Sequence, residues 1–120
     1  MRVYLPATLH LLGRLQEHRV LPVGDDVVVA HDESEDTEYD ALMTAAETSA
    51  VLAAELEPGD RRRVVVVAEV DSLGTSLALG DVVAVHADTQ DLPEEPDPDE
   101  LDDLDDLAWY ATQEIPDLLG

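Results

Sequence analysis

Residues 61–70 read RRRVVVVAEV, and this stretch decides the fold class of the chain. Its four consecutive valines favour a β-strand because β-branched side chains fit the pleated surface of a sheet. The same valines are apolar on both faces of the strand, as in a central strand that other elements cover on two sides. We therefore predict a strand at the centre of a layered α/β domain.

The segments that border this strand predict its neighbours. Acidic residues favour the start of a helix over 38–56, with Asp36 or Thr37 as its N-cap. An apolar stripe that begins at Tyr39 runs along this helix. The stretch DVVAVHAD at 81–88 predicts a second buried strand. Because the connection between the two strands is short, we expect them to pair as a hairpin.

The two ends of the chain supply the remaining elements. RVYL at 2–5 predicts a short strand, and Thr8 is the expected N-cap of a first helix. DDVVVAH at 25–31 predicts another strand. Residues 107–112 alternate as in a strand, whereas leucines and alanines at heptad spacing favour a helix. We predict the strand, followed by a short helical turn that Pro116 begins.

These elements define one small α/β domain over residues 1–120. The predicted order is β-α-β-α-β-β-linker-β, which we expect to form a sandwich with a mixed β-sheet and two main helices. The linker is the acidic segment 89–106, which contains three prolines and no basic residue. Such a composition predicts a flexible, extended connection inside the domain.

Net charge limits the partners of this domain. The chain carries 29 acidic residues against 6 arginines, for a formal net charge of −23, and no lysine or arginine follows Arg63. This charge repels nucleic-acid phosphates and anionic membrane surfaces, so we expect neither as a partner. A protein partner with a basic surface is the complementary choice.

The absence of cysteine excludes disulfides, thiolate metal sites and cysteine nucleophiles. No apolar run approaches the roughly 20 residues of a membrane span. Pro6 and His10 interrupt the first apolar residues, which therefore lack the pattern of a signal peptide. We expect a cytoplasmic protein without a cofactor or a bound metal.

Both ends of the chain carry specific motifs. MRVYLPATL at 1–9 and LAWYATQEIPDLL at 107–119 resemble a family of small, functionally uncharacterised proteins from actinobacteria. EYDALMTAAETS at 38–49, the valine strand at 61–70 and LGDVVAVHAD at 79–88 match that family more loosely. The resemblance implies a cytoplasmic protein from a GC-rich actinobacterial genome. It implies no activity and no functional residues, because none is established for the family.

His86 and Asp88 are the candidate catalytic pair. They lie two residues apart on a predicted strand, so their side chains share one face near the end of that strand. Pockets form at this place in open α/β sheets, and Glu69 is a second candidate carboxylate for His86. A histidine beside an aspartate also occurs at strand ends for structural reasons alone. No nucleophile-elbow, phosphate-loop or dinucleotide glycine pattern occurs in the sequence.

Two further clusters have a functional and a structural interpretation. The acidic residues of 32–38 alternate as at the start of a calcium loop, but Thr37 replaces the turn glycine and Met43 the closing glutamate. We therefore expect a solvated helix start. The three arginines at 61–63 are suited to an anion, but we expect them to neutralise nearby carboxylates.

Trp109 and Tyr110 are half of the aromatic residues in a chain with one tryptophan, three tyrosines and no phenylalanine. They fit either an exposed recognition patch or the core. We expect core residues, because an aromatic-poor domain needs large side chains and an ordered tryptophan buries much of its area.

Two functions from different classes follow from these observations. The leading hypothesis is a non-enzymatic cytosolic protein that acts through protein–protein contact, with a regulatory role as one form of it. The alternative is a small enzyme that uses His86 with Asp88 or Glu69. A deep pocket at His86 favours the enzyme, and an acidic face or an apolar patch favours the binding protein.

Self-repulsion among the carboxylates makes the first testable prediction. The compact state brings these charges together, and salt screens them over roughly 10 Å at 0.1 M. We expect the melting temperature to rise between low and moderate NaCl concentration, as followed by circular dichroism. A melting temperature that is flat or falls over this range contradicts a significant repulsive contribution.

Overall fold

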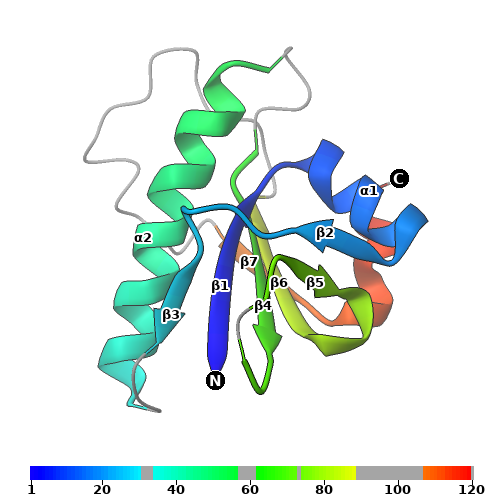
Figure 1. The fold of residues 1–120 in the computed structure, drawn as a ribbon. Coiled ribbons are helices and arrows are strands. Elements are labelled where there is room, and N and C mark those ends of the chain that lie inside the picture. The colour runs from blue at the N-terminus through cyan, green and yellow to red at the C-terminus, as the bar shows by residue number, and fades with distance from the viewer. Residues whose placement is uncertain (31–33, 57–61, 73, 89–106, 120) are drawn as a thin grey trace.

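A computed structural model of the chain describes residues 1–30, 34–56, 62–72, 74–88 and 107–119. Figure 1 shows a central sheet between two layers of helix. In chain order, the helices and strands are β1 (Arg2–Ala7), α1 (Leu9–His18), β2 (Val20–Pro22), β3 (Val28–Ala30), α2 (Glu35–Ala54), β4 (Val64–Glu69), β5 (Ser76–Ala78), β6 (Val82–Asp88), β7 (Leu107–Tyr110) and α4 (Ile115–Leu119).

The central sheet has five strands in the order β3-β1-β4-β6-β7, and β2 pairs with β5 in a separate sheet. The predicted α/β class and the pairing of β4 with β6 are confirmed, but the connection between these two strands contains β5 and is not a simple hairpin loop. The predicted mixed sheet is wrong, because every strand pair within the described ranges is antiparallel. Helix α2 connects β3 to β4, which run in the same direction. β1 lies between these two strands and is antiparallel to both, so β3 and β4 do not pair directly.

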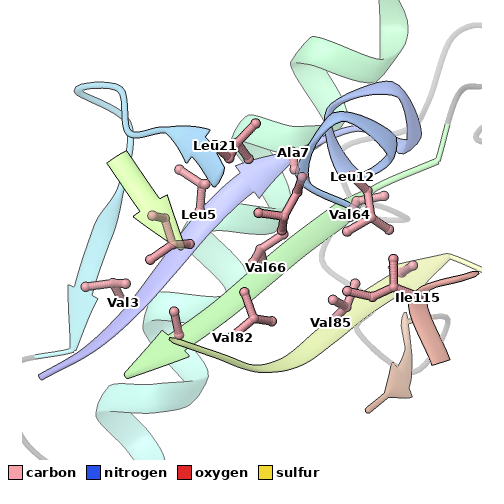
Figure 2. Packing of buried hydrophobic residues seen from close by; sticks show 14 residues of the cluster. Val3, Leu5, Ala7, Leu12, Leu21, Val64, Val66, Val82, Val85 and Ile115 are labelled. Carbon is pink, nitrogen blue, oxygen red and sulfur yellow. The ribbon is translucent and has the colours of Figure 1, made fainter. Parts of the chain in front are cut away.

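The valines of β4 fill both faces of the sheet, as the sequence predicts. Val64 and Val66 belong to one buried cluster, and Val65 and Val67 belong to the cluster on the opposite face. All four are at most 4% exposed. Figure 2 shows leucine and isoleucine side chains of α1 and α4 on the first face. Alanines of α2 cover the second face.

Helix α2 approaches the sheet closely because its buried residues are small. Its N-cap is Ser34, whose Oγ accepts a hydrogen bond from the backbone N–H of Thr37 at 3.2 Å. The helix therefore begins three residues before the predicted start. Tyr39 lies outside the buried stripe and is 51% exposed, contrary to prediction. The buried residues are Ala41, Ala45, Ala46, Ser49, Ala50 and Ala53.

The hydroxyl of Ser49 completes the ladder between β1 and β4. It accepts a hydrogen bond from the backbone N–H of Val64 and donates one to the carbonyl oxygen of Ala7, both at 2.7 Å. Ala7 and Val64 are the last register pair of these strands. Pairs with and without direct hydrogen bonds alternate along an antiparallel ladder. The ring nitrogen of Pro6 therefore points away from β4, so the missing N–H of proline removes no hydrogen bond between β1 and β4.

The C-terminal segment returns to the sheet as predicted. β7 pairs with β6 at the sheet edge, and α4 places the fully buried Ile115 in the core. The Oγ1 of Thr112 donates a hydrogen bond to the carbonyl oxygen of Val82 at 2.7 Å. The predicted linker at 89–106 lies outside the described residues.

The prediction that Trp109 is a core residue is wrong, since it is 60% exposed. Side chains alternate along β7, so Trp109 and Tyr110 point to opposite faces of the sheet. Tyr110 packs against the cluster beneath α1 and α4. Trp109 faces the other side of the sheet, where α2 lies mainly over β1, β3 and β4.

The contrast between Ile115 and Trp109 gives a stability test. Ile115→Ala leaves a cavity in the core and should lower the free energy of unfolding by about 2–5 kcal/mol. Trp109→Ala removes a mostly exposed side chain and should cost less than about half of that. Urea denaturation followed by circular dichroism measures both. A larger loss for Trp109→Ala than for Ile115→Ala contradicts the placement of Ile115 in the core and of Trp109 on the surface.

Candidate functional site

A part of the central sheet remains open on the face that α2 covers elsewhere. Because α2 packs mainly on β1, β3 and β4, the same face of β6 and β7 borders a hollow of about 370 Å³. We call this hollow the Trp109 groove. Its lining includes Tyr4, Tyr39, Val83, His86 and Trp109, together with charged residues at one end.

Exposed apolar side chains gather around the Trp109 groove. Trp109 comes from β7, Tyr39 from the first turns of α2 and Val83 from β6. They are 60%, 51% and 42% exposed, respectively. The buried Tyr4 also lines the groove, so three of the four aromatic residues of the chain meet here. Such a set of exposed apolar residues around one hollow is typical of a contact surface.

A β-bulge accounts for the position of Val83. The register between β4 and β6 shifts, so that Val67 pairs with Ala84 and Ala68 pairs with Val82. Val83 is therefore an extra residue without a partner in β4. Bulges twist a strand locally and redirect a side chain. The bulge adds an apolar residue to the lining of the Trp109 groove.

An ion-pair network lies at the charged end of the groove. The Nη1 of Arg2 is 2.9 Å from Oε1 of Glu38, and its Nε is 2.7 Å from Oε1 of Glu69. Burial alone lowers the pKa of Arg2, but the hydrogen bond and charge of Glu69, with the charge of Glu38, raise it overall. One cation between two carboxylates leaves this cluster with one net negative charge.

His86 lies in the wall of the Trp109 groove. It stands opposite Val65 in β4 and Trp109 in β7. Burial lowers the pKa of His86 below its ordinary value, because the charged imidazolium loses hydration. The imidazole is therefore neutral at pH 7. Within the described part of the chain, no hydrogen bond or ion pair involves its side chain.

Asp88 binds Arg63 and not His86, the partner that the sequence suggested. The side chains of Asp88 and Arg63 are 4% and 2% exposed, and Nη2 of Arg63 is 2.8 Å from Oδ1 of Asp88. The backbone N–H of Arg63 donates a further hydrogen bond to Oδ2 at 2.7 Å. Because Glu69 also binds an arginine, both carboxylates suggested for His86 are engaged elsewhere. A catalytic role of His86 and Asp88 stays a prediction.

The structure describes only part of the arginine cluster at 61–63 and of the acidic stretch at 32–38. Arg63 neutralises a carboxylate as expected, while Arg61 lies outside the described residues. The calcium-like stretch lies only partly within them, and its Ser34 acts as the N-cap of α2. In the described ranges, no three acidic or histidine side chains are placed to hold a metal ion. No described helix has the length and apolar character needed to cross a membrane.

Sequence reasoning selected His86 but missed the groove around it. The lining comes from β1, α2, β4, β6 and β7, which are distant in the chain. Alternation along 107–112 implies opposite faces for Trp109 and Tyr110, but both were expected in the core. It carried no information on which face a helix would cover. One local signal was the position of Tyr39 between Glu38 and Asp40, two residues that favour solvent.

Comparisons with known proteins add a family and no activity. The sequence model described as "Family of unknown function (DUF6912)" matches residues 1–119. No curated protein and no solved structure matches the chain. The family thus agrees with the resemblance seen at the two ends of the sequence.

Substitution of Asp88 tests whether its carboxylate is structural. Asp88→Asn leaves the buried charge of Arg63 uncompensated and should lower the free energy of unfolding by about 3 kcal/mol or more. His86→Gln removes a half-buried ring that has no polar partner among the described residues, and it should cost about 1 kcal/mol or less. Urea denaturation at pH 7 measures both variants. Equal losses contradict a special role of the Arg63–Asp88 pair.

Proposed function

Because the chain belongs to the DUF6912 family of unknown function, we propose its function from the Trp109 groove. The protein is a non-enzymatic binding domain, and the groove docks a partner protein that has a basic surface. This function extends the charge argument from the sequence to a defined surface. We further propose that the protein acts in the cytoplasm and that its binding has a regulatory role.

The exposure of Trp109 is the observation that carries this proposal. The only tryptophan of the chain is 60% exposed at the rim of a hollow. Tryptophan and tyrosine are enriched among the residues that dominate binding energy at protein interfaces. A single exposed apolar side chain needs no explanation, but Trp109, Tyr39 and Val83 line the same groove.

Charge selects the kind of partner. Arg2 and Glu38 line the groove, and Glu69 binds Arg2 from outside the lining, so the three side chains together keep one net negative charge. The whole chain carries a formal charge of −23. Complementary charge accelerates encounter with a basic partner and disfavours acidic ones. Nucleic acid and anionic membrane are therefore excluded from this proposal.

A small enzyme that uses His86 is the second candidate. The observation in its favour is that a half-buried imidazole lines a hollow of about 370 Å³. Ligand pockets commonly measure about 300–1,000 Å³, so this hollow is at the lower end of the range. The position of Asp88 and Glu69 against arginines weakens this candidate, because neither of the two carboxylates suggested for His86 is then free to orient it.

Site-specific crosslinking in the source cells tests the docking surface. A benzophenone side chain at position 109 should form a covalent product with a basic protein, because this position lies on the groove. The same group at position 51 is the matched control, since Val51 is 68% exposed on α2 and is not among the groove residues. Crosslinks at both positions, or at neither, contradict docking at the groove.

Affinity measured with the crosslinked partner gives the quantitative test. Trp109→Ala should weaken binding at least about tenfold, as expected for a central interface residue. Val83→Ser should also weaken binding, whereas Val20→Ser should not. Val20 is the matched control because both valines are 42% exposed and Val20 lies on β2. A cooperative thermal transition followed by circular dichroism shows that each variant is folded.

A further inference from the structure

The position of β7 suggests how a partner approaches the groove. Among the strands that the structure describes, β7 is the last of the five in the central sheet and pairs with β6 on one side. Alternate residues of such a strand direct their backbone N–H and C=O groups outward. Within the described residues, no other backbone segment bonds to these groups. The outer edge of β7 can therefore accept an additional strand.

The opposite edge of the sheet is less suited to strand addition. β3 has three residues and pairs with Arg2, Val3 and Tyr4 of β1. Beyond Tyr4, the free side of β1 presents Pro6, which has no N–H to donate. A partner strand thus finds few usable donors there. β7 is the edge that also borders the exposed Trp109.

Strand geometry places part of the partner directly over the groove. Paired strands lie about 4.8 Å apart, and directly opposite residues point to the same face of the sheet. A residue opposite Trp109 therefore projects its side chain toward the groove face. The next side chains along the partner alternate between this face and the opposite one. One long side chain at this position can reach the groove.

The groove favours a positive charge on that side chain. Trp109, Tyr39 and Tyr4 offer aromatic rings, which attract a guanidinium or an ammonium group. Glu38 and Glu69 already bind the guanidinium of Arg2 and keep one net negative charge. His86 is neutral at pH 7, so it adds no opposing charge.

Charge also disfavours a second copy of the chain as the occupant. A second copy would bring another formal charge of −23 to the interface. It would place more negative charge beside Glu38 and Glu69. A basic segment of another protein is the complementary occupant.

We propose that an extended segment of the partner pairs with the outer edge of β7 and inserts an arginine or lysine side chain into the Trp109 groove. This inference rests on the proposed binding function and specifies the recognition within the same site. Main-chain hydrogen bonds to β7 provide the alignment, and the cationic side chain provides the selectivity.

Synthetic peptides test both parts of the inference on the full chain. The probe is an acetylated, amidated seven-residue peptide of alternating valine and arginine. It should change the fluorescence of Trp109 saturably and slow hydrogen exchange of outward-facing β7 amides at least about tenfold at saturation. Citrulline in place of arginine keeps the shape but removes the charge, and should weaken binding at least about fivefold. N-methylation of alternate backbone amides of the peptide should abolish its binding, because these amides then cannot donate hydrogen bonds to β7.

Each other outcome overturns the inference. Absence of a saturable fluorescence change contradicts recognition of a basic extended segment. Equal affinity of the citrulline peptide contradicts the role of the cation. Protection at β3, or at no strand edge, contradicts pairing with β7. The crosslinking experiment at position 109 is independent of these peptides, so the groove can still be the docking surface when strand pairing fails.

Discussion

Water must be kept from both faces of β4, and the other elements are arranged around this requirement. Val64 and Val66 need one apolar layer, and Val65 and Val67 need a second one on the opposite side. Without phenylalanine, the chain builds the first layer from leucines and Ile115 and the second from the alanines of α2. An alanine-rich helix lies close to the sheet but covers a narrow strip of it. Most of that strip is β1, β3 and β4. The exposed face of β6 and β7 is therefore a consequence of the way in which β4 is covered.

Two arginines of this acidic chain form ion pairs at the ends of the central strand. Arg63 holds Asp88 at one end of the β4–β6 pair, and Arg2 holds Glu38 and Glu69 near the other end of β4. The two sites differ in energy because a buried pair is costly to break, whereas an exposed pair contributes little. The buried site maintains the alignment of two strands, and the exposed site retains a net negative charge beside the groove. The first is thus suited to stability and the second to recognition.

Local pattern was sufficient for most of the fold and for little of the site. The four valines of β4 predicted a central strand because their side chains are apolar in both directions. The acidic start of α2 and the alternation at 107–110 were equally local signals. β2 and β5 have three residues each, which is too short for a periodic pattern. Asp88 found its partner 25 residues away in Arg63, and no spacing rule identifies such a pair. The exposure of Trp109 depends on how far α2 extends across the sheet, which is a property of the assembled layers.

The hydroxyl of Ser49 limits how the sequence can change during evolution. It joins α2 to the last pair of β1 and β4 through the N–H of Val64 and the C=O of Ala7. Alanine at this position would fit the helix but leave both backbone groups buried without partners, at a cost of about 1–3 kcal/mol each. A larger apolar residue would push the helix away from the strands. Position 49 lies among the buried alanines of α2, but replacement of its serine by a small apolar residue would destabilise the fold. Only a side chain with a hydroxyl close to the backbone satisfies both backbone groups, which makes serine or threonine the expected residue in related sequences.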